Sequence, residues 1–396
     1  MFLRISPRLK KALWLALKLA VLMVLADYAR RHAQLDDELA RLDAPAAQPG
    51  PETSSRLVIE RKPSPVDATY GVRTREGASF SIPEAEVETD SRAGDHASYA
   101  LLPGLRSLFA SLSWGHLILA FAIFGPALFV MAVRWHLLLC ANDIRIPFFT
   151  LVRLHYLGFF YNTFMPGGAG GDILKAVHLA QHCTRKAEAA TVVLVDRVVG
   201  LLGLLIVASA SVVWSGGQTK GLAGQIGGLA LLLIGGLGLY FSSTLRRVVQ
   251  YDRWVSRLPR AELFIRIDNA IYGMKRHKKT LLLALAITVV LQLLEVVGVS
   301  WAGDALGLHK AHLRHYLAFV PIGFLVNAVP ISFGGIGLLE GAFLKLFHDA
   351  GVATATQGFM LGVLTRVIIL GWSALGAVSA LFPPIARPVS PASMHA

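Results

Sequence analysis

Long apolar runs separated by short polar stretches fill most of this chain of 396 residues. A run of about 20 apolar residues can cross the hydrocarbon core of a bilayer, which is about 30 Å thick. Such runs occupy 117–140, 189–214, 222–241, 281–303 and 355–382, and a shorter run at 12–29 precedes them. The pattern therefore predicts an all-α polytopic membrane protein with about six full transmembrane helices.

Two further apolar segments are interrupted by helix breakers. Residues 155–180 read HYLGFFYNTFMPGGAGGDILKAVHLA, and residues 315–347 read HYLAFVPIGFLVNAVPISFGGIGLLEGAFLKLF. Each begins with His-Tyr-Leu, reaches an Asn and a Pro, passes a Gly-Gly pair, and resumes as an apolar helix with an acid at its start. A long apolar span that carries an arginine follows each segment, so we interpret the two as an internal repeat. The breaks comprise Pro166, Gly167, Gly168, Pro330, Gly334 and Gly335.

The charges of the loops predict the topology. Residues 242–279 contain ten Lys and Arg against three Asp and Glu, and an excess of basic residues beside apolar spans indicates the cytoplasmic side. This placement requires 155–180 to be a re-entrant hairpin, and the second broken segment then opens from the opposite face. Both termini are expected in the cytoplasm of a bacterium and residues 30–112 in the periplasm. Inverted repeats with broken helices are typical of secondary transporters, whose binding site lies between the repeats.

The polar residues 30–112 form an insert that differs from the rest of the chain. They hold 10 Lys and Arg against 13 Asp and Glu, and the runs RLVIE, TYGVRT and ASFSI predict short β-strands around a marginal core. The predicted organisation is an N-terminal signal-anchor helix (1–29), the periplasmic insert (30–112), a transmembrane domain (113–382) and a cytoplasmic tail (383–396). Within the transmembrane domain, repeats 113–241 and 280–382 flank the basic loop 242–279. Cleavage of the first segment as a signal peptide stays an open alternative.

Composition narrows the possible partners. Hydrophobic residues make up 54% of the chain and charged residues 16%, and the net charge of +13 comes from outside the insert. Basic loops beside apolar spans favour anionic lipid headgroups in the inner membrane over nucleic acid. The two cysteines, Cys140 and Cys183, imply no disulfide framework.

The helix that resumes near Gly171 is the main candidate for chemistry. A helix start presents unpaired N–H groups and a partial positive charge to an anion, and Lys175 lies one turn further on. The expected headgroup site comprises Asn162, Gly170, Gly171, Asp172, Lys175, Arg197, Asn327 and Arg366. An ordinary cytoplasmic loop between two helices is the alternative interpretation. No metal site, no cofactor site and no catalytic constellation stands out.

Ionisable residues inside apolar spans are costly, and they normally face the protein interior and pair with one another. The acids expected to form ion pairs or to couple protons are Asp196, Glu295 and Glu340, together with Asp172. They either fix the packing of helices or hold Lys175, Arg197 and Arg366 until a substrate binds, and both roles stay open. Arg134, Trp135 and Lys186 are expected at the membrane interface.

Three motifs, FFYNTFMPGGAGGD, VDRVVGLL and PISFGGIGLLEG, give the chain a family resemblance over roughly 112–382. It resembles the flippase-like transmembrane domain of lysylphosphatidylglycerol synthases. The resemblance implies an inner-membrane protein that moves or handles an aminoacylated or other phosphate-bearing lipid. In the synthases a separate cytoplasmic domain attaches lysine, and this chain ends after its last span, so a stand-alone member without enzyme activity is expected. One departure is Lys175, where the family usually has arginine.

We therefore expect a flippase or transporter for a phospholipid, an aminoacyl-phospholipid or a polyprenyl-phosphate-linked lipid. Two alternatives remain. The first is a non-transporting, lipid-binding partner of an envelope assembly, which would bind through residues 30–112. The second is an integral-membrane lipid transferase. The residues do not predict an oligomeric state.

Overall fold

The computed structural model describes residues 38–41, 56–61, 69–73, 79–83, 87–88, 99–102, 104–164, 170–182, 186–214, 235, 277–328 and 335–380. The chain folds into two compact units. Unit 1 comprises Met1–Ala120, Val299–Tyr316 and Gly337–Arg366, and unit 2 comprises Phe121–Gly298, Leu317–Ile336 and Val367–Ala396.

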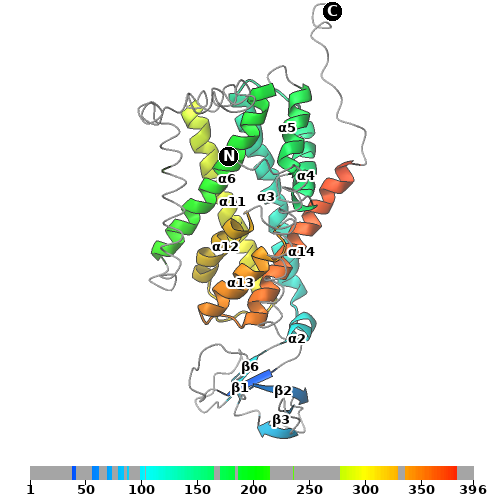
Figure 1. Cartoon of the computed structure of the whole chain (residues 1–396), viewed down its shortest axis with the longest axis vertical. Helices are drawn as coiled ribbons and strands as arrows, with labels where there is room; N and C mark the ends of the chain where they lie inside the picture. Colours follow the sequence, from blue (N-terminus) through cyan, green and yellow to red (C-terminus); the bar gives the residue numbers. More distant parts are fainter. Residues whose placement is uncertain are drawn as a thin grey trace, which may run out of the picture. The chain divides into compact units, whose positions relative to one another are not determined.

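A six-stranded sheet forms within unit 1, in the part of the sequence predicted as an insert (Figure 1). Its strands are β1 (Glu38–Arg41), β2 (Arg56–Arg61), β3 (Thr69–Arg73), β4 (Ser79–Pro83), β5 (Val87–Glu88) and β6 (Tyr99–Leu102). The order across the sheet is β4-β3-β2-β1-β6-β5, and only the β5–β6 pair is parallel. The three runs predicted as strands are β2, β3 and β4, whereas β1, β5 and β6 were not foreseen because they have only two to four residues.

The helical part of unit 1 has an aromatic core. Its elements are α2 (Leu105–Ala110), α13 (Leu338–Asp349) and parts of α3 (Trp114–Ala141), α11 (Lys278–Ala305), α12 (Leu313–Asn327) and α14 (Ala355–Ala380). The rings of Tyr316 and Phe347 pack with their centroids 5.3 Å apart, and Phe343 lies against Phe347 at 5.8 Å. Gly303 makes room for the phenol of Tyr316, with which a Cβ at this position would collide. Aromatic side chains thus tie α13 to the residues around the α11–α12 connection.

Unit 2 contains α4 (Phe148–Phe164), α5 (Gly170–His182), α6 (Lys186–Trp214) and the remaining parts of α3, α11, α12 and α14. Its apolar core includes Trp135 and Leu138 of α3, Leu151 of α4, Leu179 of α5 and Val192 of α6, all fully buried. Close approaches between backbones add to this packing. At Gly376 of α14, for example, a Cβ would collide with α4. The core fixes α3, α4, α5 and α6 around the polar residues described below.

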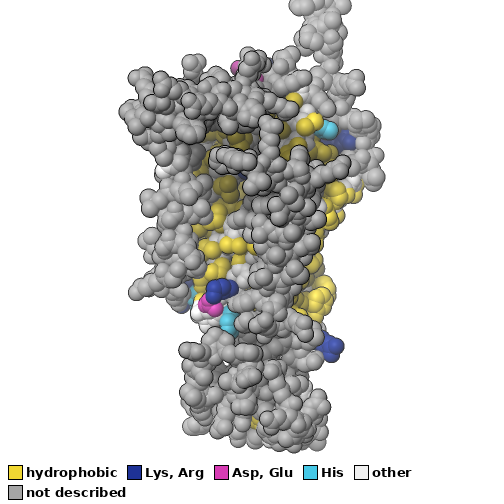
Figure 2. All heavy atoms as spheres, in the orientation of Figure 1, with side chains coloured by type: hydrophobic (Ala, Val, Ile, Leu, Met, Phe, Trp, Pro, Cys, Tyr) yellow, Lys and Arg dark blue, Asp and Glu magenta, His cyan; other side chains and the backbone are white. Residues whose placement is uncertain are grey.

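Four helices of the described part are long and apolar enough to cross a membrane: Trp114–Ala141, Glu188–Ser211, Lys278–Ala305 and Ala355–Ser379. They coincide with four of the predicted spans. Large apolar side chains on these helices are exposed, including Ile118, Leu282 and Val367, and hydrophobic side chains predominate among those coloured in Figure 2. Such apolar surface is what a lipid-facing helix requires. The runs at 12–29 and 222–241, the loop at 242–276 and the tail lie outside the described residues.

Both broken segments contain two helices each. The first consists of α4 and α5, and the second of α12 and α13. The predicted breaks Pro166, Gly167, Gly168, Pro330 and Gly334 lie outside the described residues. Gly335 is described and has φ of +75°, a left-handed conformation that suits glycine. The re-entrant character of the two segments stays a prediction.

Candidate functional site

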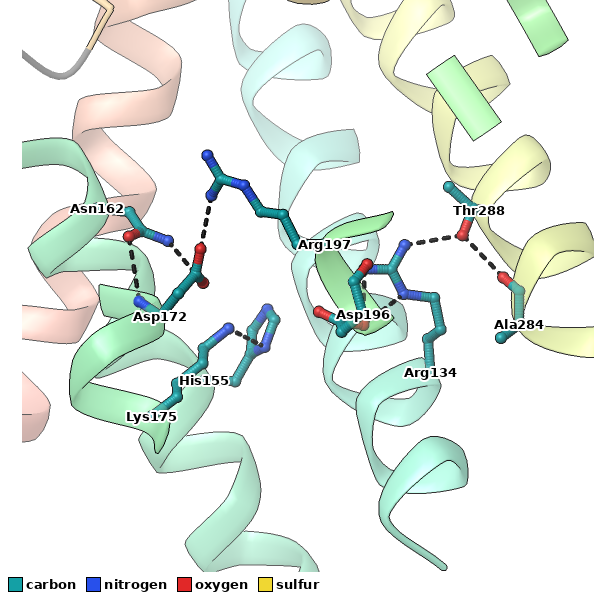
Figure 3. A network of polar contacts seen from close by, with 9 residues as sticks. All are labelled: Arg134, His155, Asn162, Asp172, Lys175, Asp196, Arg197, Ala284 and Thr288. Carbon is teal, nitrogen blue, oxygen red and sulfur yellow. Dashed lines mark hydrogen bonds and ion pairs between the residues drawn. The ribbon is translucent and has the colours of Figure 1, made fainter. Parts of the chain in front are cut away.

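A polar network connects α4, α5 and α6 within unit 2 (Figure 3). The first N–H groups of a helix have no carbonyl partner within that helix. At the start of α5, the Oδ1 atom of Asn162 accepts hydrogen bonds from the N–H groups of Gly171, at 2.8 Å, and Asp172, at 3.3 Å. A side chain of α4 therefore caps α5, and two of the N–H groups expected to bind an anion are already occupied.

The α4 and α5 helices cross at two glycines. A Cβ on Gly171 would collide with the backbone carbonyl group of Gly158, and a Cβ on Gly158 would collide with the stem of Lys175. Glycine is thus required at both positions by the close approach of the helices. This contact is what brings Asn162 within reach of the start of α5.

Asp172 in the first turn of α5 forms an ion pair with Arg197 of α6. Arg197 Nη1 lies 2.6 Å from Asp172 Oδ2, and Asn162 Nδ2 donates to Asp172 Oδ1 at 3.3 Å. A carboxylate at this position is also stabilised by the partial positive charge of the helix start. The side chains of Arg197 and Asp172 are 35% and 22% exposed. The pair is therefore accessible from outside the packed core.

Asp196, the residue before Arg197 in α6, forms an ion pair with Arg134 of α3. The Nε and Nη2 atoms of Arg134 lie 3.0 and 2.9 Å from Asp196 Oδ1. Arg134 Nη1 donates to Thr288 Oγ1 of α11 at 2.7 Å, and this hydroxyl donates to the carbonyl of Ala284 at 2.7 Å. The side chains of Arg134 and Asp196 are only 4% and 14% exposed. The network thus links α3, α6 and α11.

Lys175 points away from the start of α5 and into the packed helices. Its Nζ lies 3.2 Å from Nδ1 of His155 on α4 and 5.0 Å from the centroid of the Trp135 ring on α3. All three side chains are buried. The stem of Lys175 runs across Gly158, so its ammonium group contacts His155 and Trp135 and not the first N–H groups of α5.

A second ion pair, in unit 1, repeats the design of the first. Arg366 of α14 pairs with Glu340 in the first turn of α13, with Nε to Oε1 at 2.8 Å and Nη2 to Oε2 at 3.3 Å. Both side chains are 8% exposed. Glu340 Oε2 also accepts from the N–H of Gly337 at 2.8 Å, which caps α13. In each broken segment, an acid at a helix start pairs with the arginine of the next long helix, 25 residues later in the first and 26 in the second.

The chain matches one family model. Residues 100–376 match the model described as the lysylphosphatidylglycerol synthase TM region. The chain belongs to this family. No curated protein and no solved structure matches it. Together with the four long apolar helices, the family shows a mostly helical, multi-pass membrane protein related to lipid handling.

Within this member of the lysylphosphatidylglycerol synthase TM family, the predicted site residues fall into separate groups. Asn162, Gly171, Asp172 and Arg197 lie together, with Gly170 at the first position of α5. Glu340 and Arg366 form the other pair. Asn327 lies against Gly335, where a Cβ would collide with the asparagine side chain. Glu295 is half-buried on α11 and forms no ion pair among the described residues.

Arg134 and Trp135, which were predicted to lie at the membrane interface, are buried in the interior of the protein. The expectation for Arg134 and Trp135 was wrong, since they are 3% and 0% exposed. The signal was present in the sequence, because an arginine twenty residues into an apolar helix needs a polar partner on another helix. His155 and Thr288 were missed as members of the network, because nothing in their local sequence marks them. The side chain of Lys186 lies outside the described residues. Within the part that the structure describes, no three His, Cys, Asp or Glu side chains gather to hold a metal.

Proposed function

We propose that this protein binds a phosphate-bearing lipid by its headgroup and moves it across the inner membrane of a bacterium. The headgroup phosphate exchanges with Asp172 on the guanidinium of Arg197. The observation that carries this proposal is the exposure of the pair: its side chains are 35% and 22% exposed, against 4% and 14% for Arg134 and Asp196. Guanidinium groups bind carboxylate and phosphate in the same two-pronged geometry, so one oxyanion can replace the other.

The neighbouring pair supports this exchange by holding α6 in place. Arg134 uses Nε, Nη1 and Nη2 for Asp196 and Thr288, and its burial leaves no route for a headgroup. Breaking a buried pair of this kind costs about 3 to 5 kcal/mol. Arg197 is therefore presented by a helix that Asp196 keeps attached to α3 when the substrate binds.

Departure of Asp172 from Arg197 changes the start of α5. Asp172 is held by Arg197 and by Asn162, and Asn162 also caps α5. A headgroup on Arg197 would leave Asp172 with Asn162 alone, and the freed carboxylate would raise the mobility of this turn. This gives the site two arrangements, empty and loaded, as a transporter needs.

The lipid class follows from the cation that binds it. Arg197 recognises a phosphate, which phospholipids, aminoacyl-phospholipids and polyprenyl-phosphate-linked lipids share. The acyl or prenyl chains remain against the exposed apolar faces of the long helices. Function as a transporter without enzyme activity, with both termini in the cytoplasm, belongs to this proposal.

Purified protein in liposomes tests the proposal. Fluorescent phosphatidylglycerol in the inner leaflet should reach the outer leaflet faster than in protein-free vesicles, as measured by dithionite quenching. Arg197→Ala should lower this rate by at least about tenfold, the effect of losing one charge-assisted contact of more than about 1.4 kcal/mol. Arg314→Ala, at an exposed arginine outside the site, serves as the matched control.

Failure to accelerate any phosphate lipid would exclude transport. Mass spectrometry of the same vesicles checks the transferase alternative, since a transferase would change the mass of the lipid.

The sheet β1–β6 favours one second candidate, a lipid-binding partner of an envelope assembly. A segment of six paired strands offers a defined surface to another protein. Under this alternative, deletion of residues 38–102 would abolish function in cells and leave lipid movement in liposomes unchanged. Loss of lipid movement in the deletion variant would contradict it.

A further inference from the structure

The side chain of Lys175 is buried, and the packing of the helices leaves space for it. Its side chain is 5% exposed, and its stem fills the space left by the missing side chain of Gly158. The Nζ atom contacts His155 Nδ1 at 3.2 Å and the face of Trp135 at 5.0 Å. Among the described residues, no carboxylate pairs with it.

The charges around Lys175 do not cancel its own. Arg134 and Asp196 neutralise each other, and so do Arg197 and Asp172. A protonated Lys175 therefore leaves the network with one positive charge. Burial of an unpaired ammonium is costly, and lysine, unlike arginine, responds by releasing its proton. The net charge of the network therefore depends on the state of this one residue and of its hydrogen-bond partner.

Only one of the two side chains, Lys175 or His155, can be protonated at the contact between them. An ammonium donates to an imidazole nitrogen that carries no hydrogen, and two protonated groups would place two donors against each other. The two side chains consequently titrate as a unit. His155 Nε2 and Trp135 Nε1 are buried and have no partner among the described residues. In this arrangement each of these two nitrogen atoms carries a hydrogen and is a donor. Neither can accept a hydrogen bond from the ammonium of Lys175, so neither stabilises its protonated form.

We propose that Lys175 and His155 form a proton-binding site that is coupled to the headgroup site at Arg197. This inference rests on the proposed function. With the proton bound, the network carries one positive charge and favours an anionic headgroup on Arg197 of α6, whose partner Asp172 lies three residues before Lys175 on α5. Without it, the network is neutral and favours release. Because linkage is reciprocal, headgroup binding draws a proton onto the pair.

Charged groups from each neighbouring helix act on this pair. Arg134 of α3 and Arg197 of α6 repel its proton, and Asp196 of α6 and Asp172 of α5 attract it. The α11 helix contributes the uncharged Thr288, which binds Arg134, and the carboxyl group of Glu295, whose charge also acts on Arg134. When a headgroup takes the place of Asp172 on Arg197, the negative charge of the lipid is added to these charges. The more negative surroundings stabilise the proton on the pair of Lys175 and His155.

Calorimetry on the full chain in detergent tests the coupling. Dioctanoyl phosphatidylglycerol, whose single negative charge is constant over this range, is titrated at about pH 6 and about pH 9 in two buffers of different ionisation enthalpy. For the unmodified protein, affinity should fall roughly tenfold between the two values, with uptake of a proton on binding at the higher one. Lys175→Met should bind weakly at both values and take up no proton. Lys345→Met is the matched control, at a lysine exposed on α13.

The outcomes separate the coupling from the proposed function. Binding of the lipid with the same proton uptake in Lys175→Met as in the unmodified protein would overturn the coupling and leave the proposed function intact. Absence of binding at either pH, for every phosphate lipid, would remove both. If Lys175→Met fails to fold, Lys175→Gln replaces it, and the expectation is again loss of proton uptake.

Fluorescence of Trp135 reports the proton without any lipid. The cation over its ring affects its emission, and the difference between the unmodified protein and Trp135→Phe isolates this signal. The difference spectrum should change between about pH 6 and about pH 9 and should be constant in Lys175→Met. A change that persists in Lys175→Met would contradict the assignment of the proton to this pair.

Discussion

At the scale of the residue, glycines and an asparagine decide what the polar side chains can reach. Gly158 and Gly171 let two backbones approach, and Asn162 then caps the start of α5. The sequence predicted that Asp172 would pair with a cation and named Arg197 among the candidates, and the two form an ion pair. It did not predict the capping by Asn162 or the direction of Lys175, because both depend on how closely α4 and α5 pack.

Substitution Gly171→Ala should destabilise the protein by about 1 to 3 kcal/mol, because its Cβ would collide with the carbonyl of Gly158. Thermal unfolding in detergent measures this as a lower Tm. Gly115→Ala is the control, since a Cβ there meets nothing within 4 Å. Equal Tm values for the two variants would contradict the close crossing of α4 and α5.

At the scale of the element, the two broken segments contain the same kind of ion pair with different exposure. In each, an acid in the first turn of a short helix pairs with an arginine of the following long helix. The pair in unit 1 is buried and bidentate, and its carboxylate also caps α13. The sequence predicted that Asp172 and Glu340 would pair with cations, but the exposure of the two pairs cannot be predicted from the order of the residues.

Glu340→Gln should therefore cost more stability than Asp172→Asn. Glu340→Gln takes from the buried Arg366 the carboxylate that pairs with it, at a cost of about 3 to 5 kcal/mol, whereas loss of the partly exposed pair of Asp172 and Arg197 costs about 1 kcal/mol or less. Thermal unfolding of the two variants under identical conditions compares them. A larger loss for Asp172→Asn would refute the ranking.

The start of α12 should make stability depend on pH. Burial lowers the pKa of His315 below its ordinary value of 6.5, and the charges of Arg314 and His312 lower it further. Its Nδ1 accepts from the N–H of His312 at 3.0 Å, which protonation would prevent. The stability that this bond provides is present above pH 6.5 and is lost as the pH falls toward the lowered pKa.

The difference in Tm between about pH 7 and about pH 5 should therefore be smaller in His315→Gln than in the unmodified protein. His348→Gln, at an exposed histidine of α13, is the control and should keep the full difference. An undiminished pH dependence in His315→Gln would show that another group is responsible.

At the scale of the whole molecule, the periodicity and charge of the sequence predict helices and strands well, whereas the direction of individual side chains is hard to predict. Four of the predicted spans coincide with long helices to within a few residues, because apolar length alone specifies them. Three strands of the sheet were found by alternation, and the others are too short to show it. The residues that surround Lys175 come from three helices, and no local pattern in the sequence could bring His155 and Trp135 together.

The topology predicted from loop charges can be checked by labelling. In a variant that lacks Cys140 and Cys183, an impermeant maleimide should label Ser81→Cys in intact spheroplasts, because β4 is expected in the periplasm. Ser256→Cys, in the basic loop, should react only after the membrane is opened. The reverse pattern would invert the orientation.

Asp196 and Arg197 have a mechanical consequence for α6. Neighbouring residues of a helix point about 100° apart, and here each is fastened to a different helix. Two attachments at one level, in two directions, prevent the helix from spinning about its axis or sliding along it. Tilting about that level is the motion left to it. Under the proposed function, a headgroup that takes the place of Asp172 would leave α6 with the attachment at Asp196 and with more freedom to rotate, so the same two residues would act as a hinge controlled by the bound lipid.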